Sequence, residues 1–208
     1  MSNVLLIHSS VFGEKSQSLG LARHFLKGYP HHSLVERALT PKSMPHLDAE
    51  TFAAMGAPSG ELTGPQQVAV ALSDTLIAEL EAADTIVFAV PMYNFSIPST
   101  LKAWIDHVAR RGRTFRYTEK GPEGLLKGKK VFVLVARGGV YSEGTSHRAL
   151  DFQEPYLRTL LGFLGLNDVI FVHLEGLAMG PDAVNANRTR ALAKIERLAT
   201  GVATGAAE

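Results

Sequence analysis

Four short runs of apolar residues constrain the fold of this chain more than any other feature. They cover residues 4–7, 85–90, 131–135 and 169–172. Each run has the length of a strand and lacks the apolar–polar alternation of a strand with one wet face. Strands of this kind are buried on both faces, as in parallel sheets covered by helices. Because stretches of helical period separate the runs, the chain is expected to fold as a doubly wound α/β sheet.

A fifth and weaker strand is expected over residues 33–39, where Glu36 and Arg37 interrupt the apolar residues. Charges of this kind suit the edge of a sheet. The simplest arrangement is a five-stranded parallel sheet in the flavodoxin-like order 2-1-3-4-5. With 208 residues and no internal repeat, residues 1–208 are expected to form a single domain.

Three helices carry further expectations. A long helix from Gln66 to about Ala83 has a predicted buried stripe of Val68, Leu72, Leu76 and Leu80. A helix from about Phe152 to Gly165 is apolar over so wide a stripe that part of it is expected to pack against a second subunit. A last helix begins near Asp182, and residues 201–208 are expected to fray.

The loop over residues 91–98 lies between prolines at the carboxyl end of a central strand, where open parallel sheets bind their ligands. It contains Met92, Tyr93, Asn94 and Phe95. The prolines stiffen the backbone, the rings and the thioether offer apolar surface, and the amide can donate and accept hydrogen bonds. The loop therefore suits a planar heteroaromatic ligand. The alternative is a plain strand-to-helix connection whose aromatic residues cap the core.

Hydroxyl and amide side chains gather between the first strand and the first helix, at Ser10, Ser16, Gln17 and Ser18. Together with the free N–H groups of the helix start they can bind a phosphate. N-capping by Ser16 or Ser18 is the simpler alternative. The GxGxxG and Walker motifs are absent, and a hydroxyl-lined cradle after the first strand is typical of mononucleotide flavin sites.

The loop after the fourth apolar run contains Ala136, Arg137, Gly138 and Gly139. Paired glycines allow the backbone to approach a flat ligand with its N–H groups uncovered, although a tight turn explains this loop equally well when it is viewed alone. In the predicted strand order the three loops are neighbours. They should form one crevice, with phosphate at one end and a flat ring system at the other.

Two segments leave the regular alternation of strands and helices. Phe115 and Tyr117 alternate with polar residues, which predicts an exposed hairpin or lid that ends in a Gly121-Pro122 turn. Residues 40–64 form a long excursion with a short helix at about 49–55, and excursions of this length usually carry function or oligomer contacts.

Composition excludes several classes of protein. Without cysteine the chain has no thiol nucleophile, disulfide or thiolate metal site. A net charge of +1 gives no reason to expect a nucleic-acid surface, and the cluster of Arg110, Arg111, Arg113 and Arg116 is read as a solvated or phosphate-facing patch. No apolar run reaches membrane-spanning length and no leader is recognised, so a cytoplasmic protein without membrane contact is expected.

The histidines do not form a metal site, and none is expected. His31 and His32 lack the carboxylate neighbours and the spacing of metal ligands. His107, His147 and His173 are expected to be structural or surface residues.

Taken together, the motifs resemble the bacterial FMN-dependent NADH:quinone oxidoreductases, also called FMN-dependent azoreductases. The resemblance runs nearly end to end and is most specific in Met92 to Phe95 and in residues 113–117. It implies a homodimer with one FMN per subunit and an active site at the subunit boundary. It also implies a ping-pong reaction, in which NADH reduces the flavin and leaves before a quinone or azo compound takes two electrons in the same slot.

The resemblance also implies roles for single residues. Ser10 and Ser16 to Ser18 would hold the FMN phosphate, Met92 to Phe95 would line the isoalloxazine ring, and Ala136 to Gly139 would meet its pyrimidine edge. Tyr117 would overhang the site and face the substrate. Ala136 replaces a common hydroxyl residue and Tyr141 replaces a histidine of some relatives, so the hydrogen bonding near the flavin can differ.

Two alternatives remain open, a flavodoxin-type electron carrier and a redox-sensing regulatory flavoprotein. Such carriers are usually shorter and strongly acidic, whereas this chain is balanced in charge and has an added lid. The residues do not decide between NADH and NADPH, and residues 40–64 offer no obvious clamp for a 2′-phosphate.

Overall fold

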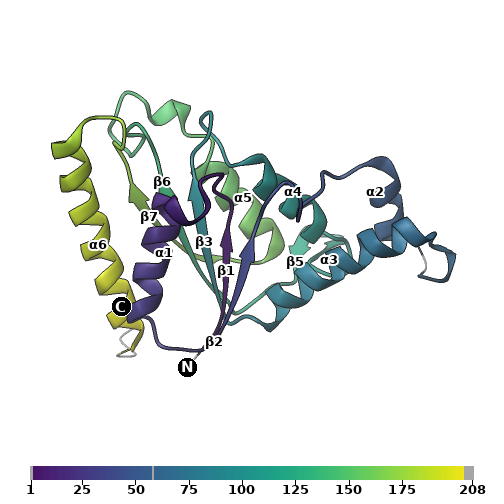
Figure 1. The fold of residues 1–208 in the computed structure, drawn as a ribbon. Helices are drawn as coiled ribbons and strands as arrows, with labels where there is room; N and C mark the ends of the chain where they lie inside the picture. Colours follow the sequence, from purple (N-terminus) through teal and green to yellow (C-terminus); the bar gives the residue numbers. More distant parts are fainter. Residues whose placement is uncertain (1, 58, 204–208) are drawn as a thin grey trace.

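Five parallel strands form the central sheet of the computed structural model, which describes residues 2–57 and 59–203. The strands are β1 (Ser2–His8), β2 (His31–Ala38), β3 (Thr85–Pro91), β6 (Lys130–Ala136) and β7 (Asp168–Leu174). Their order is β2-β1-β3-β6-β7. Counted among the parallel strands alone, this is the predicted order 2-1-3-4-5 (Figure 1). The predicted doubly wound fold is therefore confirmed.

The burial of each strand follows from its place in the sheet. All seven residues of β3, the middle strand, are buried, whereas most residues of the edge strand β2 are exposed. The alternate side chains of β3 enter two separate cores. Phe88 packs on one side and Val87 on the other. A strand that is apolar at every position is therefore the one that must be covered on both faces.

Helices cover both faces of the sheet (Figure 1). One core contains residues of α1 (Gln17–Gly28) and α6 (Pro181–Ala203), and the other contains residues of α3 (Gly64–Ala82), α4 (Ser99–Val108) and α5 (Glu154–Leu164). The apolar stripe of α4 is buried throughout, at Leu101, Trp104, Ile105 and Val108. The short helix of the excursion also forms, as α2 (Ala49–Gly56).

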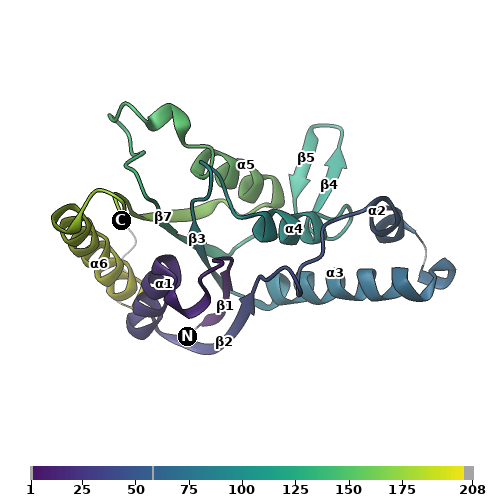
Figure 2. The same cartoon turned by 45° about the horizontal axis from the view of Figure 1, so that its top comes forward.

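The prediction for the first turns of α3 was wrong. Val68 is 72% exposed, and the buried residues of the helix are Ser73, Leu76, Ile77 and Leu80. The reason is visible in Figure 2, where the beginning of α3 extends well beyond the sheet and only its later turns pack against it. Periodicity indicates an apolar face, but it does not reveal how much of that face the sheet covers.

Two helix boundaries also differ from the prediction. Phe152 precedes α5 and is 59% exposed. The helix starts later because the Asp151 carboxylate accepts hydrogen bonds from the amides of Gln153 and Glu154, both at 3.0 Å. At the other end of the chain, α6 continues through Ala203, so residues 201–203 are helical rather than frayed. Residues 204–208, the rest of the predicted frayed tail, lie outside the described residues.

The predicted hairpin forms from β4 (Phe115–Thr118) and β5 (Gly121–Gly124), which pair antiparallel. The turn was predicted at Gly121-Pro122, but it lies between Thr118 and Gly121, because Gly121 and Pro122 already belong to β5. The Thr118 hydroxyl closes this earlier turn by accepting from the Lys120 amide at 3.2 Å and donating to the Gly121 carbonyl at 2.9 Å.

Candidate functional site

The loops that follow β1, β3 and β6 line one cavity of about 250 Å³. Parallel strands end at the same edge of the sheet, and the register pairs Pro91 of β3 with Ala136 of β6. Seven predicted site residues line this cavity: Ser10, Ser16, Gln17, Met92, Tyr93, Ala136 and Gly138. Sequence reasoning missed its remaining members, which are Phe12, Pro91, Leu177 and Ala178.

Hydroxyl groups occupy the end of the cavity beside α1. Ser16 is the N-cap of the helix, and its Oγ accepts a hydrogen bond from the Leu19 amide at 3.3 Å. The same oxygen lies 3.0 Å from Oγ of Ser18, whose side chain is fully buried. The amides of Gln17 and Ser18 have no acceptor among the described residues. This end of the cavity therefore offers free N–H donors at a helix start, where negative charge is favoured.

Tyr93 joins two of the three loops. Its hydroxyl lies 3.3 Å from Oγ of Ser10 and accepts a hydrogen bond from the Val11 amide at 3.2 Å. The Phe12 amide donates to Ser10 Oγ at 3.2 Å. The Tyr93 side chain therefore holds the loop after β1 against the loop after β3, in addition to lining the cavity.

Asn94 and Phe95 form a strained turn outside the cavity lining. Both have positive φ angles, 47° and 69°, a region that a bulky residue such as phenylalanine rarely adopts. The turn is closed by hydrogen bonds between Tyr93 and Ser96, which exchange amide and carbonyl groups at 3.0 Å in both directions. The Phe95 carbonyl also accepts from the Phe152 amide at 3.1 Å. Strain of this kind persists only where the surroundings hold it, and such positions cluster at functional sites.

The side chain of Arg137 does not line the cavity, and it is only 1% exposed. Its Nη1 lies 3.1 Å from a carboxylate oxygen of Asp151 and 3.1 Å from one of Glu175, and its Nε donates to Gln153 at 3.0 Å. A buried guanidinium needs such partners, because burying an unpaired charge costs several kcal/mol. Asp151 lies at the far end of the same loop and Glu175 directly after β7, and no local pattern in the sequence marks them as partners of Arg137.

In the backbone of Gly138 and Gly139 the carbonyl groups are hydrogen-bonded, whereas the amide groups are not. Their carbonyls accept hydrogen bonds from the amides of Ala178 at 3.0 Å and Gly176 at 2.9 Å. Their own amides have no acceptor in the part of the chain that the structure describes. These are the uncovered N–H groups that the paired glycines predicted.

Tyr117 lies away from this cavity. It is 62% exposed on β4 and lines a second cavity of about 630 Å³, together with residues of α2 and of the segment after α4. Within one chain it therefore does not overhang the loops after β1, β3 and β6. Its predicted role toward the substrate stays a prediction.

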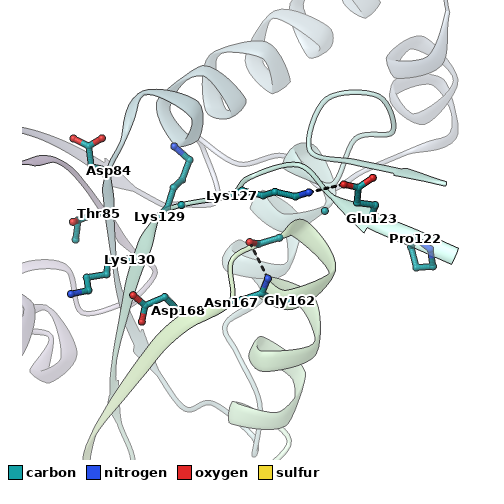
Figure 3. Close-up of a pocket in the computed structure, with 13 residues that line it drawn as sticks. Asp84, Thr85, Pro122, Glu123, Lys127, Lys129, Lys130, Gly162, Asn167 and Asp168 are labelled. Atoms are coloured by element: carbon teal, nitrogen blue, oxygen red, sulfur yellow. Dashed lines mark hydrogen bonds and ion pairs between the residues drawn. The ribbon is translucent and has the colours of Figure 1, made fainter. Parts of the chain in front are cut away.

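A further cavity of about 800 Å³ lies at the opposite, amino end of β3, β6 and β7 (Figure 3). Three lysines and three carboxylates line it, so their charges balance. Lys127 is paired with Glu123 at 2.6 Å, and Lys129 donates to the carbonyls of Glu81 and Ala83. Burial lowers the pKa of Lys129. Because the charges balance and two of the three lysines are already engaged, this cavity shows no preference for an anionic or a cationic ligand.

Two buried or half-buried histidines have structural partners. Nε2 of His107 lies 3.0 Å from the Pro45 carbonyl, and Nε2 of His173 lies 2.7 Å from Glu154. Burial would raise the pKa of Glu154, but hydrogen bonds from His173 and Arg158 outweigh it and lower the pKa to about 2. Among residues 2–57 and 59–203, no cluster of three metal-ligating side chains is found. No described helix has the length and apolarity needed to cross a membrane.

The chain is similar to a known protein family, to individual relatives and to solved structures. The model of the "Flavodoxin-like fold" family matches residues 2–199. FMN-dependent NADH:quinone oxidoreductases of Azotobacter vinelandii and Hyphomonas neptunium are 47% and 49% identical to the chain. The first alignment covers 96% of the chain and the second all of it, and both cover the whole relative. A crystal structure of an azoreductase from Bacillus anthracis superimposes with a TM-score of 0.86 at 31% identity, over 96% of this chain and 99% of that one.

The order of the strands is that of the flavodoxin-like class. Within that class, the chain belongs to the family of the FMN-dependent NADH:quinone oxidoreductases. The family predicted from the sequence motifs is therefore confirmed.

Proposed function

We propose that this protein is an FMN-dependent reductase that passes two electrons from NADH to quinones and reductively cleaves aromatic azo bonds. The chain is an oxidoreductase because of its family, and its relatives are FMN-dependent enzymes that use NADH and quinones. Azo compounds are included among the substrates because the similar solved structures are azoreductases, one of them in complex with FMN. The observation that carries the proposal is the cavity that joins the side chains of Ser10 and Ser16, beside the start of α1, to Gly138 in the loop after β6.

The hydroxyl end of the cavity fits the phosphate of a mononucleotide. Ser10 contributes a side-chain hydroxyl, and Gln17 and Ser18 contribute amides without an acceptor in the described chain. These donors lie at the first turn of α1, where the helix dipole favours an anion. In this proposal Ser16 and Ser18 hold the cradle in shape through their mutual hydrogen bond.

The other end of the cavity fits a flat ring with a carbonyl edge. Met92 and Tyr93 offer apolar and polarisable surface to the ring, while the free amides of Gly138 and Gly139 can donate to its oxygens. When bound, FMN supplies the two-electron redox chemistry, and the protein binds and orients it. Arg137 acts in this proposal through its backbone, because its side chain is engaged by carboxylates.

We further propose that one slot serves both substrates, so that NADH leaves before the acceptor enters, and that two subunits complete this slot. The position of Tyr117 outside the cavity of the single chain is consistent with a site at a subunit boundary. The purified holoprotein tests the mechanism once its released cofactor has been identified as FMN. Double-reciprocal plots of NADH oxidation at several fixed menadione concentrations should be parallel. Intersecting lines would show a ternary complex and overturn the single slot.

The same preparation separates the alternative functions and tests azo cleavage. A flavodoxin-type electron carrier or a redox-sensing regulatory flavoprotein would oxidise NADH at a negligible steady-state rate. The proposed reductase should bleach methyl red under anaerobic conditions and release two aromatic amines, with two NADH oxidised per azo bond because the cleavage takes four electrons. Turnover with menadione but none with methyl red would restrict the proposal to quinones.

A further inference from the structure

One carboxylate oxygen binds both ends of the segment that carries the paired glycines. Oε1 of Glu175 accepts a hydrogen bond from Nη1 of Arg137 at 3.1 Å and another from the Tyr141 amide at 2.9 Å. Gly138 and Gly139 lie between these two donors in the chain. Glu175, which directly follows β7, therefore holds residues 137–141 at their first and last positions.

The residues that follow Glu175 hold the same segment by its carbonyl groups. The amides of residues 176–178 donate to the carbonyls of residues 137–139 at 2.9–3.1 Å. In a planar trans peptide group the N–H points away from the C=O of the preceding residue. Because the carbonyls face the loop after β7, the amides of Gly138 and Gly139 point away from that loop. Neither amide has an acceptor among residues 2–57 and 59–203.

The pair of Arg137 and Glu175 is buried deeply enough to be a fixed point for the segment. The side chain of Arg137 is 0% exposed and that of Glu175 is 9% exposed. Asp151, at 1% exposure, also lies 3.1 Å from Nη1 of Arg137, and Gln153 accepts from Nε at 3.0 Å. The guanidinium therefore keeps one counter-ion if Glu175 is replaced, and the cost of an unpaired buried charge is avoided.

We propose that Glu175 is a positioning residue, whose carboxylate orients the amides of Gly138 and Gly139 for hydrogen bonds to the carbonyl edge of the bound cofactor. The inference rests on the proposed function, which supplies FMN as that cofactor. Glu175 does not line the cavity, so it acts through the segment that it holds. A pair of glycines is otherwise conformationally free, and donors that are already ordered bind a ligand without the entropic cost of ordering a loop.

The first test compares FMN with riboflavin, which lacks the phosphate, by titration of the apoprotein. Glu175→Ala should weaken both flavins by the same factor, about five- to tenfold, because hydrogen bonds are lost at the ring and not at the phosphate. Ser16→Gly together with Ser18→Ala should instead weaken FMN and spare riboflavin. The matched control is Glu154→Gln, since Glu154 lies 4.0 Å from Nη2 of Arg137 and pairs with His173 and Arg158. It should leave both affinities unchanged.

The second test observes the edge of the ring in the holoprotein, reconstituted with FMN that carries ¹³C at its two ring carbonyls. A hydrogen bond to a carbonyl oxygen moves the carbon resonance downfield. In Glu175→Ala at least one of the two resonances should therefore move upfield, whereas the ³¹P resonance of the phosphate should not move. Glu175→Gln keeps the oxygen and loses the charge, so its resonance should lie between those of the wild type and Glu175→Ala. Glu154→Gln should move none of them.

These measurements separate positioning from a purely structural role. A Glu175→Ala protein that is less stable to urea but has wild-type carbonyl resonances and riboflavin affinity would overturn the inference. Equal effects of Glu154→Gln would also overturn it, because the loss of a buried charge would then explain them. If Glu175→Ala does not fold, unchanged carbonyl resonances in Glu175→Gln would have the same consequence. A purified protein that binds no FMN would contradict the proposed function, whereas bound FMN with resonances independent of Glu175 would contradict this inference alone.

Discussion

A serine at a helix start can serve as an N-cap or as part of a phosphate site, and the contacts of Ser16 are compatible with both roles. Its oxygen caps α1 by accepting from the Leu19 amide, and its hydroxyl group is paired with that of Ser18. The cap leaves the amides of Gln17 and Ser18 free among the described residues. Capping therefore satisfies one orphan donor of the helix and leaves others for an anion.

A variant can separate these two tasks. Ser16→Gly together with Ser18→Ala removes both hydroxyls, while glycine at the N-cap costs only a few tenths of a kcal/mol. If the two hydroxyls hold the amides of Gln17 and Ser18 in place for the FMN phosphate, the dissociation constant of FMN should rise at least tenfold, since a misplaced amide loses a hydrogen bond to a charged group that contributes about 1.5–3 kcal/mol. Titration of the apoprotein with FMN, followed by quenching of flavin fluorescence, measures this change.

The control for this variant is a cap far from the cavity. Asp48 caps α2 by accepting from the Thr51 amide at 2.7 Å. Asp48→Ala should lower the free energy of unfolding by about 1 kcal/mol without changing the affinity for FMN. If the serine variant bound FMN as tightly as the wild type, the phosphate assignment would be wrong.

At the scale of the elements, the β4–β5 hairpin makes a close backbone contact with the end of α5. A side chain on Gly124 would overlap backbone atoms of Leu164 and Gly165. Gly165 is the left-handed C-cap of α5, with φ of 95°. The Leu126 amide also donates to the Leu164 carbonyl at 3.0 Å. The hairpin that carries Tyr117 is thus anchored where its last strand meets the end of the helix.

Gly124→Ala should force the hairpin and the end of α5 apart. Overpacking of this kind typically lowers the free energy of unfolding by about 1–3 kcal/mol, which urea denaturation can measure. Gly20→Ala is the matched control, because a methyl group there meets nothing within 4 Å and the residue lies inside α1. It should raise stability by roughly 0.5–1 kcal/mol. A loss of stability in both variants would mean that the contact with α5 is not responsible.

At the scale of the whole molecule, large apolar side chains remain exposed on loops at the carboxyl edge of the sheet. They are Val11, Phe12, Phe95, Phe152 and Met179. Exposed apolar surface around a candidate site often marks an interface, which agrees with the predicted homodimer. Sedimentation velocity should then show a dimer at micromolar concentration.

Phe152→Asp should shift this dimer toward the monomer, because a carboxylate at the interface would lose its hydration. Leu34→Asp, on the exposed edge strand β2, serves as the control and should leave the dimer unchanged. A wild-type monomer with full activity would contradict both the interface and an active site shared between subunits.

Most of the fold could be predicted because its signals are local. Continuous apolar runs predicted the strands β1, β3, β6 and β7, although β7 lies at an edge, and the charges of Glu36 and Arg37 correctly predicted the other edge strand, β2. Errors arose where the answer depends on distant partners. The exposure of Val68 depends on how far α3 extends past the sheet, and the start of α5 depends on the carboxylate of Asp151.

The three loops of the cavity and the family could be predicted from the sequence, because motifs are properties of neighbouring residues. The strand order followed as the simplest one for alternating strands and helices. What each side chain in those loops does depends on contacts that form only in the folded chain. Arg137 was expected at the cavity, but Asp151 and Glu175 hold its guanidinium behind it. Asp151 lies 14 residues away at the far end of the same loop and Glu175 directly after β7, so both meet Arg137 only when the chain folds. A buried guanidinium is stable only beside its counter-ions, and the sequence around Arg137 does not show where those carboxylates lie in the fold.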